Sequence, residues 1–384
     1  MPARSVVFFI SGHGFGHASR EVEVLNTLGE ARPDIPLVVR TAASPSLLAR
    51  TIRVPVTILE GACDTGVIQR DSVTHDDEAT VVQAAAFQAT MPARGAAECL
   101  RLAPFHVGVI VGDIPPLAFE VATQLAVPSV AIGNFTWDWI YEWYREPLRR
   151  APRLLDDIRR GYRQATRALQ LPLSGGFDVF PTVTQIPFIA RHATRTRADT
   201  RQQLGLDARR PVALLSFGGY GLDHLDLASL DCLDDWTIVV TGHTGSSGNT
   251  GVGRSKQIHV LPESTFDVGL RYEDVVAAVD VVVTKPGYGI VSECVAHNIA
   301  VLYTSRGHFR EYELMVAEMP TLLRCRFLDQ TALFAGQWRT ALEALMQQSV
   351  PLGSVATDGA RRASDVIQEM HDVGSAPASK SAAN

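Results

Sequence analysis

The sequence predicts an α/β protein built from two tandem doubly wound, Rossmann-like domains that face a central cleft. Short apolar runs alternate with helical patterns along nearly the whole chain, and the second half repeats the scheme of the first. The runs are rich in β-branched residues and apolar on both faces, as buried parallel strands must be. The length of 384 residues also fits two domains of ordinary size.

The first half is expected to form five strands and four helices. The strands are predicted at 5–10, 36–40, 55–59, 107–113 and 128–133. The helices are predicted at 19–30, 44–51, 81–101 and 116–125. Regular alternation of strand and helix predicts a parallel sheet with helices on both faces.

The second half is expected to repeat this arrangement. Its strands are predicted at 211–217, 236–242, 257–261, 280–285 and 300–304, with helical patterns after Asp223, Tyr272, Gly289 and Glu311. A segment rich in proline and then arginine separates the halves. We therefore expect an acceptor-side domain over 1–186, a connection over 187–198, a nucleotide-sugar-binding domain over 199–373, and a disordered tail over 374–384.

The overall charge and the cysteines exclude several classes of protein. The net charge is −6 and the pI about 6.0, so nucleic acid is not an expected partner. The arginine-rich stretches 145–167 and 191–210 are expected to be solvated helix faces. Five dispersed cysteines predict reduced thiols and a cytoplasmic protein. The apolar run at the N-terminus is too short for a signal peptide, and no run is long enough to span a membrane.

Ligands of doubly wound sheets bind beyond the carboxyl ends of the strands, so the loops there are the candidate sites. The first of them, 11–20, holds three alternating glycines and two histidines, His13 and His17. Its glycine spacing differs from G-x-G-x-x-G, which disfavours a nicotinamide oxidoreductase. The histidines lack an H-E-x-x-H glutamate, so no metal is expected. They are either loop residues with local partners or functional groups; the strand-to-helix position favours the second interpretation.

Asp113 ends the apolar strand 107–113 and admits two interpretations. Its carboxylate can accept a hydrogen bond from a histidine, orient the ring and stabilise it once protonated, as beside a general base. Alternatively, it caps the helix expected near Pro116. The residues alone leave both interpretations open.

Two further glycine-rich loops follow strands of the second half, at 216–221 and 285–293. Such turns present backbone N–H groups and the positive end of a helix, which suits a diphosphate. Because no Walker motif is present, a nucleoside diphosphate held by backbone is favoured over ATP with magnesium. Glu293 can reach ribose hydroxyls.

The aromatic stretch 134–144 (NFTWDWIYEWY) also has two interpretations. Aromatic residues at this density are most often core, but some of them can line an acceptor pocket. Docking to a membrane surface is a weaker third possibility.

The chain resembles glycosyltransferases of the GT-B fold. It is most similar to the branch that contains the glycosyltransferase-like N-terminal region of plant L-arabinokinase and its bacterial relatives. The matching segments are SGHGFGHASREVEVLNTL, NFTWDWIYEWY, RTRADTRQQLGL and DVVVTKPGYGIVSECVAHNIAVLYTSRGHFRE. They extend over nearly the whole expected ordered chain. No kinase module follows, so sugar-kinase activity is not implied.

The resemblance assigns roles to individual residues. It places His17 near the reacting hydroxyl, with Asp113 as its partner. It implies nucleotide-sugar contacts from Gly287, Gly289, Ser292, Glu293, His308, Arg310 and Glu311. The glycine-rich loops add Gly14, Gly16, Ser216, Gly218, Gly219, Lys285 and Tyr288 as expected contacts. The sequence lacks the W-x-P-Q and H-C-G-W signatures of the plant enzymes, and Lys285-Pro-Gly departs from the lipid-linked enzyme.

The expected function is therefore transfer of a sugar from a UDP-sugar to an acceptor hydroxyl, without metal or cofactor and with inversion. The acceptor, whether sugar, lipid or small molecule, is unknown. Two alternatives use the same fold: an inactive protein that binds or senses a nucleotide-sugar, and a nucleotide-sugar epimerase or hydrolase.

Overall fold

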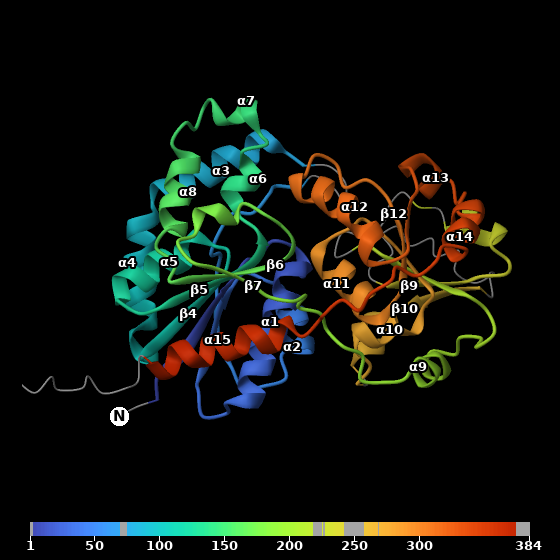
Figure 1. The fold of residues 1–384 in the computed structure, drawn as a ribbon, viewed down its shortest axis with the longest axis horizontal. Helices are drawn as coiled ribbons and strands as arrows, with labels where there is room; N and C mark the ends of the chain where they lie inside the picture. The colour runs from blue at the N-terminus through green and yellow to red at the C-terminus, as the bar shows by residue number, and fades with distance from the viewer. Residues whose placement is uncertain are drawn as a thin grey trace, which may run out of the picture.

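The computed structural model describes residues 3–69, 75–217, 225, 227–241, 257–267 and 269–373. Within these ranges the chain forms two parallel sheets, each covered by helices, which confirms the predicted fold class (Figure 1). None of the helices described is long and apolar enough to cross a membrane. The predicted tail 374–384 and two predicted site residues, Gly218 and Gly219, lie outside the described residues.

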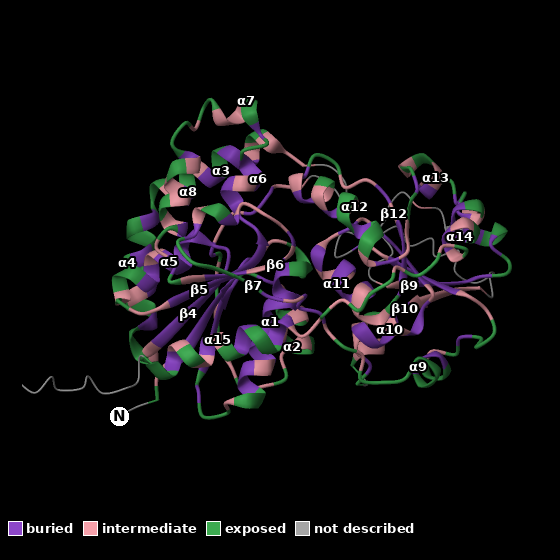
Figure 2. Cartoon of the chain, viewed as in Figure 1, coloured by how far each residue is buried: buried purple, intermediate pink, exposed green. Residues whose placement is uncertain are grey.

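The first sheet has seven strands in the order β3-β2-β1-β4-β5-β6-β7. Their bounds are β1 Ser5–Ile10, β2 Leu37–Thr41, β3 Thr57–Glu60, β4 Val107–Asp113, β5 Ser129–Phe135, β6 Arg167–Gly175 and β7 Val183–Gln185. The central strands are buried throughout, as their apolar sequences predict (Figure 2). The last two strands were not predicted, because β6 is only partly apolar and β7 is a three-residue exposed edge.

Among the described residues, eight α-helices between Gly14 and Tyr162 accompany this sheet. They are α1 Gly14–Ala31, α2 Pro45–Thr51, α3 Asp77–Ala89, α4 Met91–Leu102, α5 Pro116–Leu125, α6 Trp137–Tyr141, α7 Arg145–Leu148 and α8 Leu154–Tyr162. The predicted helix 81–101 is two helices, because the backbone leaves helical geometry at Thr90 and Pro92 starts a new turn. Helix α1 begins at Gly14, earlier than predicted, so its first turn contains Gly14, Gly16 and His17.

The second sheet has six strands in the order β10-β9-β8-β11-β12-β13. These are β8 Val212–Ser216, β9 Thr237–Thr241, β10 Ile258–Leu261, β11 Val281–Thr284, β12 Ala300–Tyr303 and β13 Cys325–Phe327. The accompanying helices are α9 Arg197–Gln203, α10 Tyr272–Ala278, α11 Tyr288–His297, α12 Arg310–Leu322, α13 Gln330–Phe334 and α14 Arg339–Met346. Both sheets reverse their strand order at the first strand of the domain, where ligands of such sheets bind.

The last helix, α15 Gly359–Val373, follows the second sheet in the chain. It crosses back and packs against α1 and β4 of the first domain (Figure 1). Ile367 on this helix is fully buried, and a ring nitrogen of His371 lies 3.0 Å from the carbonyl oxygen of Arg4. The reason is that α15 has an apolar face that α1 covers.

Two chain segments therefore connect the domains, where the sequence suggested one. They run close together: the Gly359 N–H donates to the carbonyl of Phe188 at 2.9 Å, and the Phe188 N–H donates to Ala356 at 3.2 Å. A Cβ atom at Gly359 would lie 2.2 Å from the carbonyl oxygen of Pro187, so only glycine fits this crossing.

Candidate active site

The candidate site lies where helix α1 of the first domain meets helix α11 of the second. Helix α1 follows β1 and helix α11 follows β11, as the predicted glycine-rich turns require. A Cβ atom on Gly289, in the first turn of α11, would lie 3.5 Å from the Cα atom of Gly16, in the first turn of α1. Neither helix has a side-chain cap or an acidic residue in its first turn. Two helix N-termini that have no side-chain cap among the described residues therefore face each other, an arrangement that attracts anions.

The glycines of these turns leave open space around the backbone. A Cβ atom at Gly14 or Gly16 would meet no atom within 4 Å, and Gly14 adopts a positive φ of 73° that favours glycine. At Gly287 the nearest atom to an added Cβ would be Nη1 of Arg306, at 3.6 Å. Backbone N–H groups can thus be approached closely from the cleft side.

Basic side chains surround this meeting point. Arg306, in the loop after β12, donates from Nη1 to the carbonyl of Pro286 at 3.2 Å. Burial lowers the pKa of His13 to about 3, helped by the nearby charges of His17 and Arg306. Burial and then Arg306 likewise lower the pKa of His75 to about 4, and Lys285 acts in the same direction on both. Burial thus keeps both histidines neutral near pH 7, and the cationic side chains beside them are those of Arg306 and Lys285, which favour a bound anion.

His17 and Asp113 form a buried pair beside these turns. Ile10 of β1 pairs in register with Asp113 of β4, so helix α1 begins next to the Asp113 carboxylate. The Nδ1 atom of His17 lies 2.8 Å from Oδ2 of Asp113. With Nδ1 donating to the carboxylate, Nε2 is the ring nitrogen that can accept a proton. The N-cap residue of helix α5 is Pro115, and no side chain forms a capping hydrogen bond there. The interpretation of Asp113 as the N-cap of this helix is therefore wrong.

Arg20, which the sequence analysis did not single out, contacts the same carboxylate. Its Nη2 lies against Oδ1 of Asp113, and its Nη1 donates to Oδ1 of Asn134 at 2.9 Å. Beside it, burial raises the pKa of Glu21 well above its ordinary value, and the Asp113 charge adds to this effect. The Asp113 carboxylate thus contacts both His17 and Arg20 within a buried group.

The predicted diphosphate and ribose residues have partners within the protein. The Ser216 hydroxyl bonds with Tyr272, and the Ser292 hydroxyl donates to the Gly289 carbonyl at 2.9 Å. The Tyr288 hydroxyl accepts from the N–H of Ile189 at 3.2 Å. These contacts fix the shape of the turns, and direct contact of the side chains with a ligand stays a prediction.

Glu293 is buried rather than open to the cleft. Arg191 donates from Nε to its Oε1 at 2.6 Å, and burial raises the pKa of the carboxyl to about 7. Its Oε2 has no partner among the described residues. The predicted contact of Glu293 with a ribose hydroxyl stays a prediction.

The predicted sugar-contacting residues His308, Arg310 and Glu311 face the first domain. The Nδ1 atom of His308 lies 2.8 Å from Asp77, and Arg310 donates to the carbonyl of Trp139 at 2.7 Å. Glu311 is buried and accepts from Asn134 at 2.7 Å. The three residues thus join the domains, a position that the sequence alone did not indicate.

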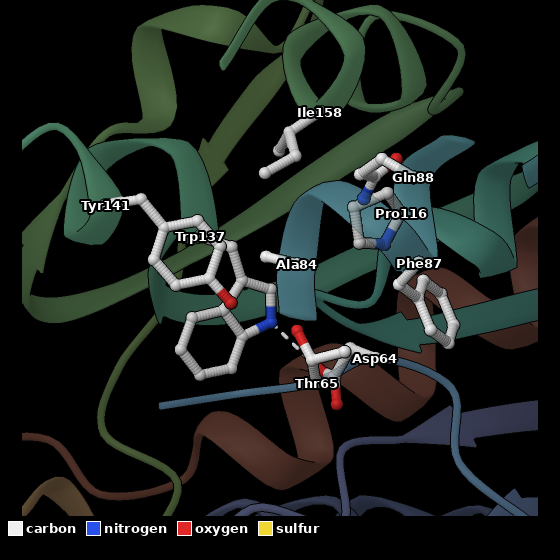
Figure 3. A pocket seen from close by; sticks show the side chains of 9 residues that line it. All are labelled: Asp64, Thr65, Ala84, Phe87, Gln88, Pro116, Trp137, Tyr141 and Ile158. Atoms are coloured by element: carbon white, nitrogen blue, oxygen red, sulfur yellow. Dashed lines mark hydrogen bonds between the residues drawn. The ribbon is translucent and has the colours of Figure 1, made fainter. Parts of the chain in front are cut away.

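The aromatic stretch is mainly core, as the commoner interpretation held. Trp137, Tyr141 and Tyr144 are almost fully buried, and only Trp143 is notably exposed. A small pocket remains beside Trp137, with room of about 10 Å³, which suits a single water molecule (Figure 3). Its residues are Asp64, Thr65, Ala84, Phe87, Gln88, Pro116, Trp137, Tyr141 and Ile158.

Asp64 is a further residue that the sequence analysis missed. It accepts from Nε1 of Trp137 at 2.8 Å, the bond drawn in Figure 3, and from the Ser11 hydroxyl at 3.0 Å. Burial raises its pKa to about 6. Through the bond to Ser11, Asp64 connects the loop after β3 to the start of the loop 11–20.

The chain is similar to known proteins in sequence and in fold. The chain is 27% identical to L-arabinokinase from Arabidopsis thaliana over 369 residues, which are 94% of this chain and 34% of that protein. The chain thus spans about a third of the length of this relative. No family model matches the sequence.

Solved glycosyltransferases superpose on nearly the whole chain. The glycosyltransferase of kitacinnamycin matches with a TM-score of 0.58 and 17% identity, covering 97% of this chain and 96% of that one. A UDP-glucosyltransferase from Polygonum tinctorium matches with a TM-score of 0.59 and 14% identity, covering 99% and 96%. MurG from Acinetobacter baumannii matches with a TM-score of 0.51 and 11% identity, covering 95% and 99%. The chain therefore has the fold of the GT-B glycosyltransferases, which confirms the resemblance inferred from its motifs.

Proposed function

We propose that the protein transfers a sugar from a UDP-sugar to an acceptor hydroxyl. The observation that carries this proposal is the meeting of two uncapped helix N-termini, at Gly16 and Gly289, beside the His17–Asp113 pair. The helix ends and the basic residues around them suit a diphosphate. The histidine suits a proton acceptor.

The proposed reaction is a single displacement. His17 takes the proton of the acceptor hydroxyl on Nε2 while Asp113 holds Nδ1. The hydroxyl oxygen attacks the anomeric carbon of the donor, the bond from that carbon to the diphosphate oxygen breaks, and UDP leaves with the electron pair. The anomeric configuration is inverted. Backbone N–H groups of α1 and α11, with Lys285 and Arg306, would stabilise the charge that develops on the leaving group, without a metal.

The choice of UDP rests on the similar proteins. One is a UDP-glucosyltransferase, and another, UDP-glucose: anthocyanidin 3-O-glucosyltransferase, was solved with UDP. Since these relatives share less than a fifth of their residues with this chain, the donor sugar and the acceptor remain to be found by experiment. The dispersed cysteines, all free among the described residues, agree with the proposed cytoplasmic site of action.

A thermal-shift series with UDP, GDP, ADP, UDP-sugars and NADH tests the proposal. UDP or a UDP-sugar at 100 times its dissociation constant should add about 2.7 kcal/mol to the free energy of unfolding. Turnover of the donor that binds is then measured for the wild type, for His17→Gln, and for a control, His106→Asn. His106 is exposed at the opposite end of β4.

We expect His17→Gln to keep UDP binding and lose transfer by a factor of about 10²–10⁴, and the control to keep both. Full transfer by His17→Gln would refute the base assignment. Binding without any turnover would support the inactive sensor instead, and release of free sugar or an epimer without acceptor would support the hydrolase or epimerase.

A further inference from the structure

A continuous chain of side chains joins the proposed base to the proposed diphosphate turn. It runs from His17 through Asp113, Arg20, Asn134 and Glu311 to Arg306, and we call it the interdomain network. The first half lies in the first domain: Asp113 contacts both His17 and Arg20, and Arg20 donates to Asn134 at 2.9 Å. The second half lies in the other domain.

Glu311 is the residue at which the two halves meet. Its Oε1 accepts from Nδ2 of Asn134 at 2.7 Å, and its Oε2 accepts from Nη1 of Arg306 at 2.7 Å. The same Nη1 donates to the carbonyl of Pro286, in the turn that precedes α11. Glu311 is 3% exposed and Asn134 1%, so water does not compete for these bonds.

From this geometry we infer that Glu311 is a positioning residue. Through Glu311, the positions of the His17 and Asp113 side chains depend on whether a diphosphate is bound at the turn that precedes α11. The inference rests on the proposed function and gives Glu311 a role other than direct contact with the sugar. A diphosphate at the turn attracts the Arg306 guanidinium, which is then shared between phosphate and Glu311. The Glu311 carboxylate and Asn134 readjust, and Arg20 passes the change to Asp113.

This role predicts an unusual combination of effects in Glu311→Gln. The amide keeps the shape and can still accept from Asn134, but it no longer neutralises Arg306. The freed guanidinium should bind the diphosphate more strongly, so UDP affinity should rise several-fold while kcat falls about tenfold. A purely structural defect would instead weaken UDP binding.

The test uses the full chain labelled with ¹⁵N-histidine and UDP as the probe. The ring signals of His17 are assigned by their loss in His17→Gln and followed during titration with UDP. The wild type should show a change at His17 on saturation. Glu311→Gln and Asn134→Ala should bind UDP and lose at least half of that change. The matched control is Glu313→Gln, on the exposed face of the same helix turn.

Each result decides a separate question. If the wild type does not bind UDP, the proposed function fails and the inference fails with it. If UDP binds but both variants retain the full His17 response, the inference fails and the proposed function stands. Should Glu311→Gln not fold, Asn134→Ala alone decides, because it breaks the same connection without changing any charge.

Discussion

Gly16 and Gly289 bring the backbones of two helix N-termini together across the domain interface. A Cβ atom on Gly289 would lie 3.5 Å from the Gly16 Cα, which is ordinary van der Waals contact. Position 289 therefore has room for one added carbon atom between α1 and α11. Any larger side chain at Gly289 must therefore push the two turns apart.

Gly289→Val should reduce UDP affinity by tenfold or more. Its two added methyl groups would have to move the Gly16 backbone and so disturb the N–H groups of both turns. Gly289→Ala is the matched control, because a single Cβ fits at the observed distance and should change affinity about twofold at most. Isothermal titration with UDP compares the two variants, and equal affinities for valine and alanine would contradict the proposed place of the diphosphate.

Asp113→Asn should impair both stability and transfer. The substitution keeps the shape but leaves the buried Arg20 without its counterion, and breaking a buried ion pair costs about 3–5 kcal/mol. It also removes the carboxylate that orients His17, for which a loss of about 10²–10⁴ in kcat is expected.

Urea unfolding and transfer assays measure these two effects of Asp113→Asn. The exposed Asp156, in the first turn of α8, provides the control Asp156→Asn. A stable variant with unchanged turnover would show that the carboxylate charge is not needed.

The buried strands were predictable because parallel strands carry a continuous apolar signal. Once the strands were located, the loops at their carboxyl ends could be identified as candidate ligand sites. These loops or the strand ends contain His17, Asp113 and Gly289. The strands β7 and β13 gave no such signal, because each has three residues and is mostly exposed. Sequence periodicity predicts that a helix has an apolar face but not which helix covers that face. The packing of α15 against α1 could therefore not be predicted.

Arg20, Asn134 and Arg306 escaped prediction for a related reason. Arg20 and Asn134 become meaningful only through partners that are 114 and 177 residues away in sequence. Arg306 does so through the carbonyl of Pro286, on a different loop of its own domain. Asn134 did offer a signal, since it is a polar residue near the carboxyl end of the buried strand β5. Arg20 looked like one charged residue on an amphipathic helix, and its burial against Asp113 could not be seen from spacing.

His13 should make the wild type less stable in mild acid. Burial lowers its folded-state pKa from 6.5 to about 3, so below pH 6.5 the unfolded chain takes up a proton that the folded chain does not. The free energy of unfolding should therefore fall as the pH drops, by up to about 2 kcal/mol at pH 5 from this residue.

His13→Gln should remove this part of the pH dependence. Denaturant unfolding at pH 8 and pH 5 is compared for the wild type, His13→Gln and the control His106→Asn. Relative to that of the wild type, the free energy of unfolding of His13→Gln should be higher at pH 5 than at pH 8. If the difference is the same at both pH values, His13 does not carry the expected linkage.

Ile367→Ala should destabilise the first domain, although residue 367 comes after the whole second domain in the sequence. Ile367 is fully buried in the core shared with α1, and truncation of such a residue costs about 2–5 kcal/mol. Hydrogen exchange should show lost protection first in α1 and β4, because α15 packs on them. Val366→Ala, on the half-buried side of the same helix, is the matched control and should cost less. Lost protection confined to α10 and α11 would instead show that the stability of α15 is coupled to the second domain, and would contradict the expected result.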